Sequence, residues 1–148
     1  MLYYWQFTNI LLTTITFQEQ NGVSGSIPSE IAMLPSLQMI GLYNNSIVGQ
    51  LPRNIGKLSH LQELDLEQNN LHGPLFFDEL FELADTLKTL RVSNNAFTGI
   101  IPNEIGNFTK LKELWLASTD LTGSIPLGMG SLKELGMEET HILTYSIT

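Results

Sequence analysis

Three carboxylate side chains alternate along one short stretch of the chain. Glu63, Asp65 and Glu67 occupy every second position of LQELDLEQN, so a strand there would direct all three to one face. Paired carboxylates are the catalytic groups of glycosidases, and a retaining enzyme holds them about 5 to 5.5 Å apart. Same-face neighbours on a strand lie about 6.5 Å apart, and an open sheet offers nothing that would raise one carboxyl pKa and make it an acid. We therefore expect no enzyme activity, and a hydrolase is the weaker alternative.

Histidines and cysteines offer no metal site in the sequence pattern. His60, His72 and His141 fall at unrelated places, so no two of them have the spacing of metal ligands. The chain has no cysteine, which excludes disulfides, thiolate ligands and cysteine nucleophiles. The glycine motifs that bind phosphates or dinucleotides and the HExxH zinc motif are also absent. We expect neither a metal nor a cofactor.

Composition and charge favour one folded unit that does not bind nucleic acid. A length of 148 residues with 43% hydrophobic residues suits a single domain. The net charge is -8 and only 7 residues are Lys or Arg, whereas nucleic-acid binding requires clustered basic side chains. No apolar run reaches the roughly 18 residues of a membrane-spanning helix, so we expect no membrane insertion within this chain.

The alternating carboxylates belong to a unit that recurs along the chain. The pattern LxxLxLxxN begins again at intervals of 25, 24, 26, 24 and 21 residues. The six starts are Leu12, Leu37, Leu61, Leu87, Leu111 and Leu132. Repetition at such a period is typical of a solenoid in which each unit contributes one short strand and one return segment. Positions one, four and six are apolar, so these side chains are expected to face a core and their neighbours to face solvent.

Each unit continues with residues that suit a turn. The ninth positions are Asn45, Asn69, Asn95 and Thr119. Stacked side chains there are expected to satisfy backbone groups that leave the strand ladder, because an amide both donates and accepts hydrogen bonds. A glycine follows four residues after the asparagine, and then Ile-Pro, as in Gly99 and Ile101-Pro102. The glycine predicts a backbone conformation that a Cβ would disfavour, and the proline predicts an extended return.

The combined pattern LxxLxLxxNxLxGxIPxxIGxLxx resembles the plant-type leucine-rich repeat of receptor-kinase ectodomains, receptor-like proteins and polygalacturonase-inhibiting proteins. The match is nearly complete over 37–54 and 87–107 and extends over 12–143. The resemblance implies an α/β repeat fold of about six repeats, a curved solenoid with a concave parallel β-sheet. It also implies short 3-10 or α-helical turns on the convex side and an extra extended segment around GxIP.

Some units depart from this pattern. The first is one residue longer before its glycine, so we expect a bulge near Gln20 and Asn21. The third lacks Ile-Pro, and its stretch FFDELFELADTL has apolar residues at helical spacing, which predicts an α-helical turn or two on the convex side. Residues 1–11 are expected to form an aromatic cap or a partial repeat, and 144–148 a tail. Because the cysteine-containing caps of the family are absent, we expect a segment of a longer repeat protein.

Recognition is expected on the outward-facing side chains of the concave sheet. The candidate binding residues are Tyr43, Glu63, Asp65, Glu67, Arg91, Glu113 and Trp115. An aromatic side chain near an arginine is typical of interface hot spots, and we expect Trp115 to be exposed. The leading hypothesis is a non-catalytic module that binds a protein, peptide or glycan. In the alternatives, Asp65 and Arg91 only pair across strands, or the chain is a structural segment whose binding site lies elsewhere.

Two N-glycosylation sequons occur, NNS at Asn44 and NFT at Asn107. Such acceptors are modified in the secretory pathway. We therefore expect an extracellular or membrane-tethered protein, with a cytoplasmic location as the alternative.

Overall fold

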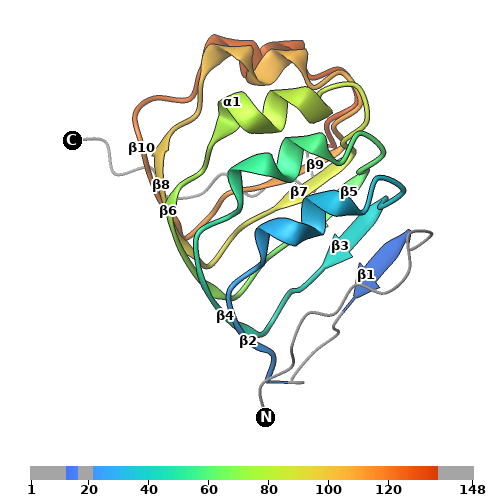
Figure 1. Cartoon of the computed structure of the whole chain (residues 1–148). Helices are drawn as coiled ribbons and strands as arrows, with labels where there is room; N and C mark the ends of the chain where they lie inside the picture. The colour runs from blue at the N-terminus through green and yellow to red at the C-terminus, as the bar shows by residue number, and fades with distance from the viewer. Residues whose placement is uncertain (1–12, 17–21, 137–148) are drawn as a thin grey trace.

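The chain coils into a stack of similar turns, each built from a strand, a second extended segment and a helical segment (Figure 1). The computed structural model describes residues 13–16 and 22–136. The first described turns, blue in Figure 1, lie at one end of the stack, and the last, orange, lie at the other. The predicted repeat solenoid is therefore confirmed. The expected bulge at Gln20 and Asn21, the cap over 1–11 and the tail over 144–148 lie outside the described residues.

One side of the stack is a parallel sheet, which we call the concave sheet. Its five described strands follow one another in chain order, because each turn adds one strand beside the last. The pairing is in register, so that Leu64 faces Ile40 on one side and Leu90 on the other. The strands are β1 (Thr14–Thr16), β3 (Met39–Gly41), β5 (Glu63–Asp65), β7 (Thr89–Arg91) and β9 (Glu113–Trp115).

The extended segments that follow the concave strands pair into a second parallel sheet. All but the last of these segments include the glycine of their unit, which agrees with the extra extended segment that the resemblance implies around GxIP. Glycine takes a positive φ there, for example 88° at Gly49 and 118° at Gly99, a conformation that a Cβ disfavours. The strands are β2 (Ser24–Gly25), β4 (Ser46–Gly49), β6 (Asn70–Pro74), β8 (Ala96–Ile100) and β10 (Asp120–Thr122).

Helical segments line the third, convex side. A proline stands just before most of them, and at Pro52 the backbone is still extended, with φ -60° and ψ 130°. The helix begins at the next residue, and proline is tolerated at this position because an N–H group there would have no partner within the helix. The third unit has no such proline and forms the predicted α-helical turn. The segments are η1 (Ser29–Met33), η2 (Arg53–Lys57), α1 (Phe77–Leu80), η3 (Phe81–Leu83), η4 (Asn103–Asn107) and η5 (Leu127–Ser131).

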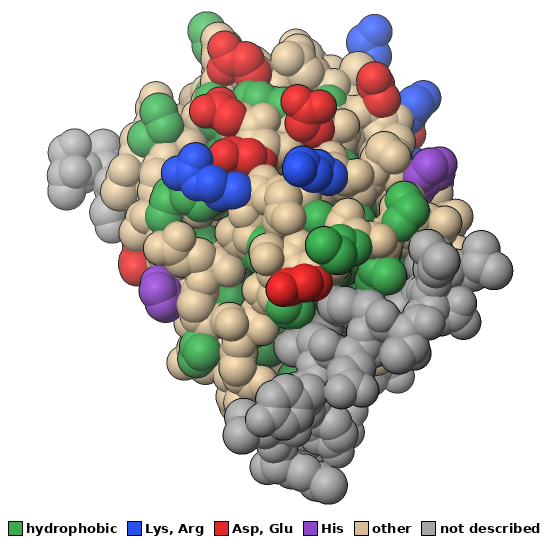
Figure 2. Space-filling view, viewed as in Figure 1, with side chains coloured by type: hydrophobic (Ala, Val, Ile, Leu, Met, Phe, Trp, Pro, Cys, Tyr) green, Lys and Arg blue, Asp and Glu red, His purple; other side chains and the backbone are tan. Residues whose placement is uncertain are grey.

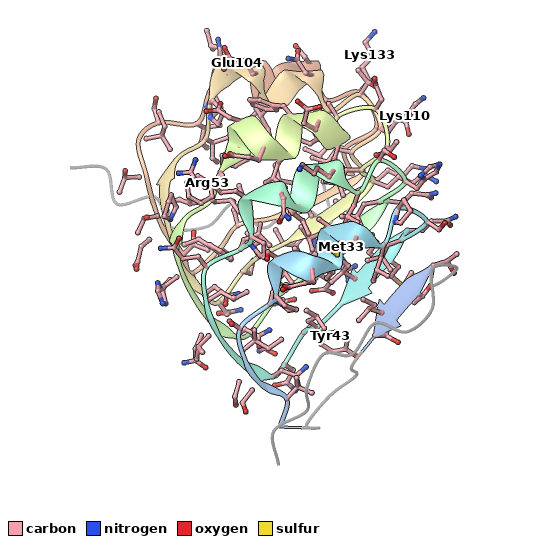
Figure 3. All side chains as sticks on the ribbon, in the orientation of Figure 1. Met33, Tyr43, Arg53, Glu104, Lys110 and Lys133 are labelled. Carbon is pink, nitrogen blue, oxygen red and sulfur yellow. The ribbon has the colours of Figure 1, made fainter. Side chains whose placement is uncertain are left out.

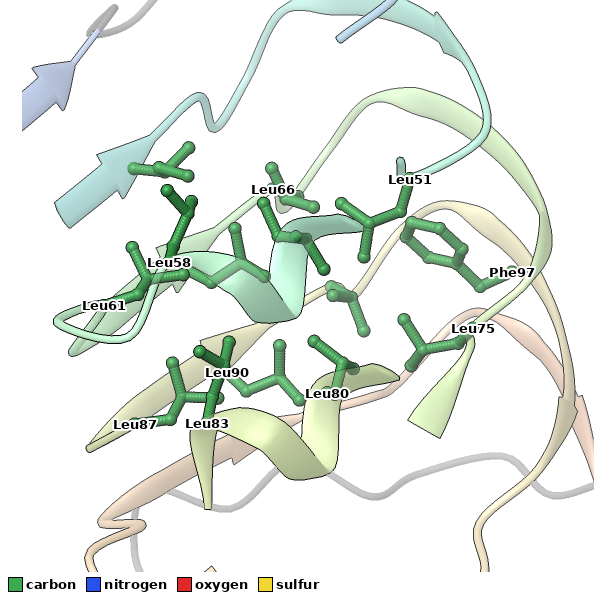
Figure 4. Close-up of a cluster of buried hydrophobic side chains, with 14 of the residues drawn as sticks. Leu51, Leu58, Leu61, Leu66, Leu75, Leu80, Leu83, Leu87, Leu90 and Phe97 are labelled. Carbon is green, nitrogen blue, oxygen red and sulfur yellow. The ribbon is translucent and has the colours of Figure 1, made fainter. Parts of the chain in front are cut away.

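Aliphatic side chains from all three sides fill the interior (Figure 4). Leu61, Leu64 and Leu66 of the third unit are fully buried. The helical insert contributes Leu80 and Leu83 to the same core. Full burial of one such side chain stabilises the fold by about 1.5 to 3 kcal/mol. Three-residue strands offer few hydrogen bonds of their own, so this core holds them in place.

Asparagine side chains bridge neighbouring units where the chain leaves the concave sheet. Nδ2 of Asn69 donates to the carbonyl oxygen of Leu42, one unit earlier, at 2.8 Å, and Oδ1 accepts from the backbone N–H of Ile47 at 3.0 Å. Asn95 repeats this arrangement one unit later. Thr119 instead donates to Leu116 within its own unit at 2.8 Å. Because the threonine side chain is shorter than that of asparagine, the hydrogen bond of Thr119 stays within its own unit.

The residue before each of these asparagine or threonine positions has a left-handed backbone. The positive φ values are 54° at Asn44, 52° at Gln68, 56° at Asn94 and 54° at Ser118. Asparagine tolerates this region better than other non-glycine residues. The repeat pattern did not single out this position, because glutamine and serine also occupy it.

Candidate recognition surface

The outward side chains of the concave sheet form three cross-strand rows, set by the strand pairing. The central row is Gly41, Asp65, Arg91 and Trp115. The row at the start of each strand is Met39, Glu63, Thr89 and Glu113. The row just after each strand is Tyr43, Glu67, Ser93 and Ala117. All the candidate binding residues therefore belong to one continuous face.

Arg91 is the centre of a charged cluster on this face. Its Nη1 donates to Oδ2 of Asp65 at 3.1 Å, and its Nε donates to Oε2 of Glu113 at 3.0 Å. Nη2 of Arg91 also contacts Glu113. The guanidinium carbon lies 4.7 Å from the ring centroid of Trp115, the geometry of a cation–π contact. Burial, the largest single influence, lowers the pKa of Arg91, but the hydrogen bonds and charges of Glu113 and Asp65 outweigh it and raise this pKa.

Burial on this face is greater than the sequence predicted. Asp65 is only 4% exposed, because Arg91 lies against it and its own Oδ1 accepts the backbone N–H of Glu67 at 3.1 Å. Trp115 is half-buried rather than exposed, since the guanidinium group covers its ring. The Asp65–Arg91 pair is thus part of the structure of the sheet.

Glu63 lies at the edge of the charged cluster and is half-buried. Burial raises the pKa of its carboxyl group, Arg91 lowers it, and the negative charges of Asp65 and Glu113 raise it further. The expectation that nothing would raise a carboxyl pKa here was wrong, because neighbouring side chains partly cover this part of the sheet. Within the described residues, the carboxylate of Glu63 makes no hydrogen bond or ion pair.

Tyr43 and Glu67 mark the far end of the strands, where the chain bends toward the second sheet. Tyr43 follows β3 and is half-buried (Figure 3). Oε1 of Glu67 accepts a hydrogen bond from Nδ2 of Asn94 in the next unit at 3.3 Å. Ser93 lies beside them in the same row, and no sequence pattern selects this serine. It is 2% exposed, and its hydroxyl has no hydrogen-bond partner in the described part of the chain.

The convex side carries a second feature that the sequence did not reveal. A cavity of about 480 Å³ lies between η2 and α1, and the lining includes Arg53, Lys57 and Glu79. Arg53 pairs with Glu79 at 3.2 Å and stacks 3.9 Å above the ring centroid of Phe76. Figure 2 shows acidic and basic side chains close together over these helical segments. Because the charges are mixed and exposed, the cavity favours no single ligand charge.

The two sequons differ in their surroundings. Asn107 is exposed at the end of η4, and Thr109 of the same sequon is exposed as well. Asn44 is half-buried in a left-handed turn, and its backbone N–H donates to the carbonyl oxygen of Glu67. The backbone N–H of Ser46, the third sequon residue, donates to Val23.

Over residues 13–16 and 22–136, no group of three His, Asp or Glu side chains could hold a metal ion. Within these same ranges, no helix has the length and apolar character needed to cross a membrane.

The strands and helical segments together define a solenoid built from repeats. The chain belongs to the leucine-rich repeat family, because a family model described as "Leucine-rich repeat region" matches residues 11–142. No curated protein matches it.

Solved ectodomains of plant receptors share the fold. The ectodomain of the membrane receptor kinase GASSHO1/SCHENGEN3 from Arabidopsis thaliana, in complex with CASPARIAN STRIP INTEGRITY FACTOR 2, has a TM-score of 0.77 and 35% identity. The Arabidopsis receptor kinase HAESA, in complex with the peptide hormone IDA and the co-receptor SERK1, has a TM-score of 0.75 and 36% identity. The similarity covers 85% and 81% of this chain but only 15% and 20% of those chains.

A plant ice-binding protein is also similar, with a TM-score of 0.72 and 32% identity over 80% of this chain and 37% of that chain. The fold therefore occurs in receptors solved with peptides and in a protein named for a different ligand. Fold alone does not decide function. The class is shown, a plant-type leucine-rich repeat protein, and a ligand must be argued from side chains.

Proposed function

We propose that this chain recognises a peptide or protein on the outward face of the concave sheet, as part of an extracellular or membrane-tethered receptor-like protein. One contrast carries the proposal. The inward residues at the centres of the strands are Ile40, Leu64, Leu90 and Leu114, whereas the adjoining outward residues are Gly41, Asp65, Arg91 and Trp115. Core packing requires the first set to be alike. Core packing places no such demand on the outward residues. These differ from unit to unit, which suits selective recognition.

The dimensions of the face suit an extended peptide. Tyr43 follows β3 and Trp115 ends β9, three strand spacings away. At about 4.8 Å per spacing, the separation across the sheet is about 14 Å, which an extended peptide covers in about four residues. The two aromatic side chains would anchor the ends of such a segment, and the charged cluster would lie beneath its middle. A glycan is the alternative ligand.

The carboxylates support binding rather than catalysis. Asp65 is held by Arg91 and by the backbone of Glu67, and Glu113 is held by Arg91. Two of the three carboxylates near Arg91 are therefore committed to internal contacts, which leaves no matched acid and nucleophile pair for a hydrolase. We propose no catalytic role for this face.

Selection of displayed random peptides against the full chain tests the proposal. Selected peptides should lose about tenfold or more in affinity for Trp115→Ala, because aromatic anchors contribute most to interface energy. Val48→Ala is the control, since Val48 is 45% exposed on the second sheet, away from the proposed face. Undiminished binding to both Trp115→Ala and Tyr43→Ala would instead favour a structural segment whose binding site lies elsewhere.

A further inference from the structure

The positive charge of Arg91 is already neutralised within the concave sheet. Three of its N–H donors point at Asp65 and Glu113, and its face lies against Trp115. Glu63, Asp65 and Glu113 together carry three negative charges against this one guanidinium, so two negative charges remain uncompensated at neutral pH. A ligand group that approaches this part of the face meets a negative surface.

Glu63 is the carboxylate that the fold leaves available. Glu63 is half-buried, and within the described residues its carboxylate has no hydrogen bond or ion pair. Burial raises the pKa of its carboxyl group despite the proximity of Arg91. The ionised form of Glu63 therefore costs the folded state free energy. A half-buried charge that folding does not require is characteristic of a functional position.

A second polar group on the same face lacks a partner. Ser93 is 2% exposed, and its hydroxyl makes no hydrogen bond within the described residues. It lies two residues after Arg91, with the core residue Val92 between them, so both side chains belong to the outward face. An unsatisfied buried hydroxyl destabilises the folded state. On either side of the Asp65–Arg91 pair, the described face thus holds the unpaired carboxylate of Glu63 and the unsatisfied hydroxyl of Ser93.

The neighbours of Glu63 suit the side chain of a basic residue. Met39 precedes it in the same row and is half-buried, and Thr89 follows it and is buried. Methionine offers an adaptable apolar surface for the aliphatic stem of arginine or lysine, while the charged head reaches the carboxylate. Gly41 lies beside Asp65 and has no side chain of its own, and the side chain of Thr16 on β1 lies next to it.

We propose that the concave sheet accepts a basic peptide segment, with an arginine or lysine of the ligand paired to Glu63 and its stem packed on Met39. This inference rests on the proposed function and adds to it the charge of the ligand and its docking point. Charge complementarity selects a basic peptide over an acidic or neutral one.

Fluorescence anisotropy with the full chain tests this pairing. The probe is a short labelled peptide of alternating arginine and serine, and the counter-probe alternates glutamate and serine. Glu63→Gln should weaken binding of the basic probe about tenfold, the effect of one charge-assisted hydrogen bond. Glu104→Gln is the matched control, because Glu104 is exposed on η4 on the convex side (Figure 3) and its change alters the net charge equally.

Two results would overturn the pairing. Equal losses for Glu63→Gln and Glu104→Gln would mean that net charge alone attracts the probe. No binding of the basic probe, or equal binding of the acidic one, would exclude a preference for basic ligands. Peptides from the random selection separate this inference from the proposed function. If they lose affinity for Trp115→Ala but not for Glu63→Gln, the concave face binds peptides and the pairing is wrong.

Discussion

Nη1 of Arg91 on β7 lies 3.1 Å from Oδ2 of Asp65 on β5. The two residues are 26 positions apart in the sequence, and the parallel register makes them direct neighbours. The Asp65 side chain is only 6% exposed, and Arg91 is its ion-pair partner. A structural ion pair therefore lies at the centre of the proposed recognition surface.

Replacement of Arg91 by alanine is expected to destabilise the fold. The change leaves the buried Asp65 carboxylate without its cation. We expect the free energy of unfolding to fall by about 2 to 3 kcal/mol, less than for a fully buried ion pair, because water partly reaches this one. Urea unfolding measures it. Lys110→Ala is the control, because Lys110 lies 3.8 Å from Glu134 and both side chains are well exposed, at 54% and 40%. Its loss should stay below about 1 kcal/mol. Equal losses would show that water satisfies Asp65 without Arg91.

Loss of a bridging asparagine should cost more than loss of the threonine in the same position. Asn95 donates to Leu66 at 2.9 Å and accepts from Leu71 at 3.0 Å, so Asn95→Ala leaves several buried backbone groups unsatisfied. We expect a loss of about 2 to 4 kcal/mol, since each such group costs about 1 to 3 kcal/mol and nearby groups share part of the loss. Thr119→Ala removes one bond within its own unit and should cost about 1 kcal/mol. Thermal melts compare the variants, and the reverse order would contradict the bridging role.

The stability of Glu63→Gln should depend on pH with a defined sign. Burial, together with Asp65 and Glu113, raises the pKa of Glu63 above its ordinary value of 4.5 in the folded state, although Arg91 opposes the change. The folded chain therefore binds this proton more tightly than the unfolded chain, and the ionisation of Glu63 lowers stability as the pH rises through this range.

Glutamine stays neutral, so the variant should be more stable than the native chain at pH 7, by less than about 1 kcal/mol for this half-buried group. The two should be equally stable well below pH 4.5. Urea midpoints at both pH values provide the measurement. Lower stability of the variant at pH 7 would mean that the ionised carboxylate stabilises the fold, which is the opposite of the expected sign.

Glycosylation should distinguish the two sequons. In a secretory host, Asn107 should carry a glycan, because its side chain and Thr109 are exposed beside η4. Asn44 should remain unmodified in the folded chain, because it is half-buried and the backbone of its sequon is hydrogen-bonded within the fold. Asn107→Gln should remove the mass that a glycosidase releases, and Asn44→Gln should leave it unchanged. A chain that carries no glycan in that host would count against the proposed extracellular location.

The repeat predicted the inward half of the structure because core packing imposes the same demand on every unit. Leu61, Leu64 and Leu66 are buried as the period required, and the helical spacing in the third unit correctly predicted α1. The spacing of apolar residues along the chain indicates which side chains are buried and where a helix forms, so a single sequence was sufficient to predict both. The left-handed residues Gln68 and Ser118 escaped prediction, since neither residue type signals that conformation.

The repeat pattern alone specifies the solenoid, its strands and helical turns, and the face on which recognition is proposed. How that face is charged follows from the folded arrangement. Only the parallel register brings Arg91 between Asp65 and Glu113, covers Trp115, and leaves Glu63 half-buried without a partner in the described chain. These outcomes depend on contacts between residues one repeat apart. The repeat register already suggested the Asp65–Arg91 pair, but the burial of Asp65 and Trp115 follows from three-dimensional packing, which the repeat pattern does not contain.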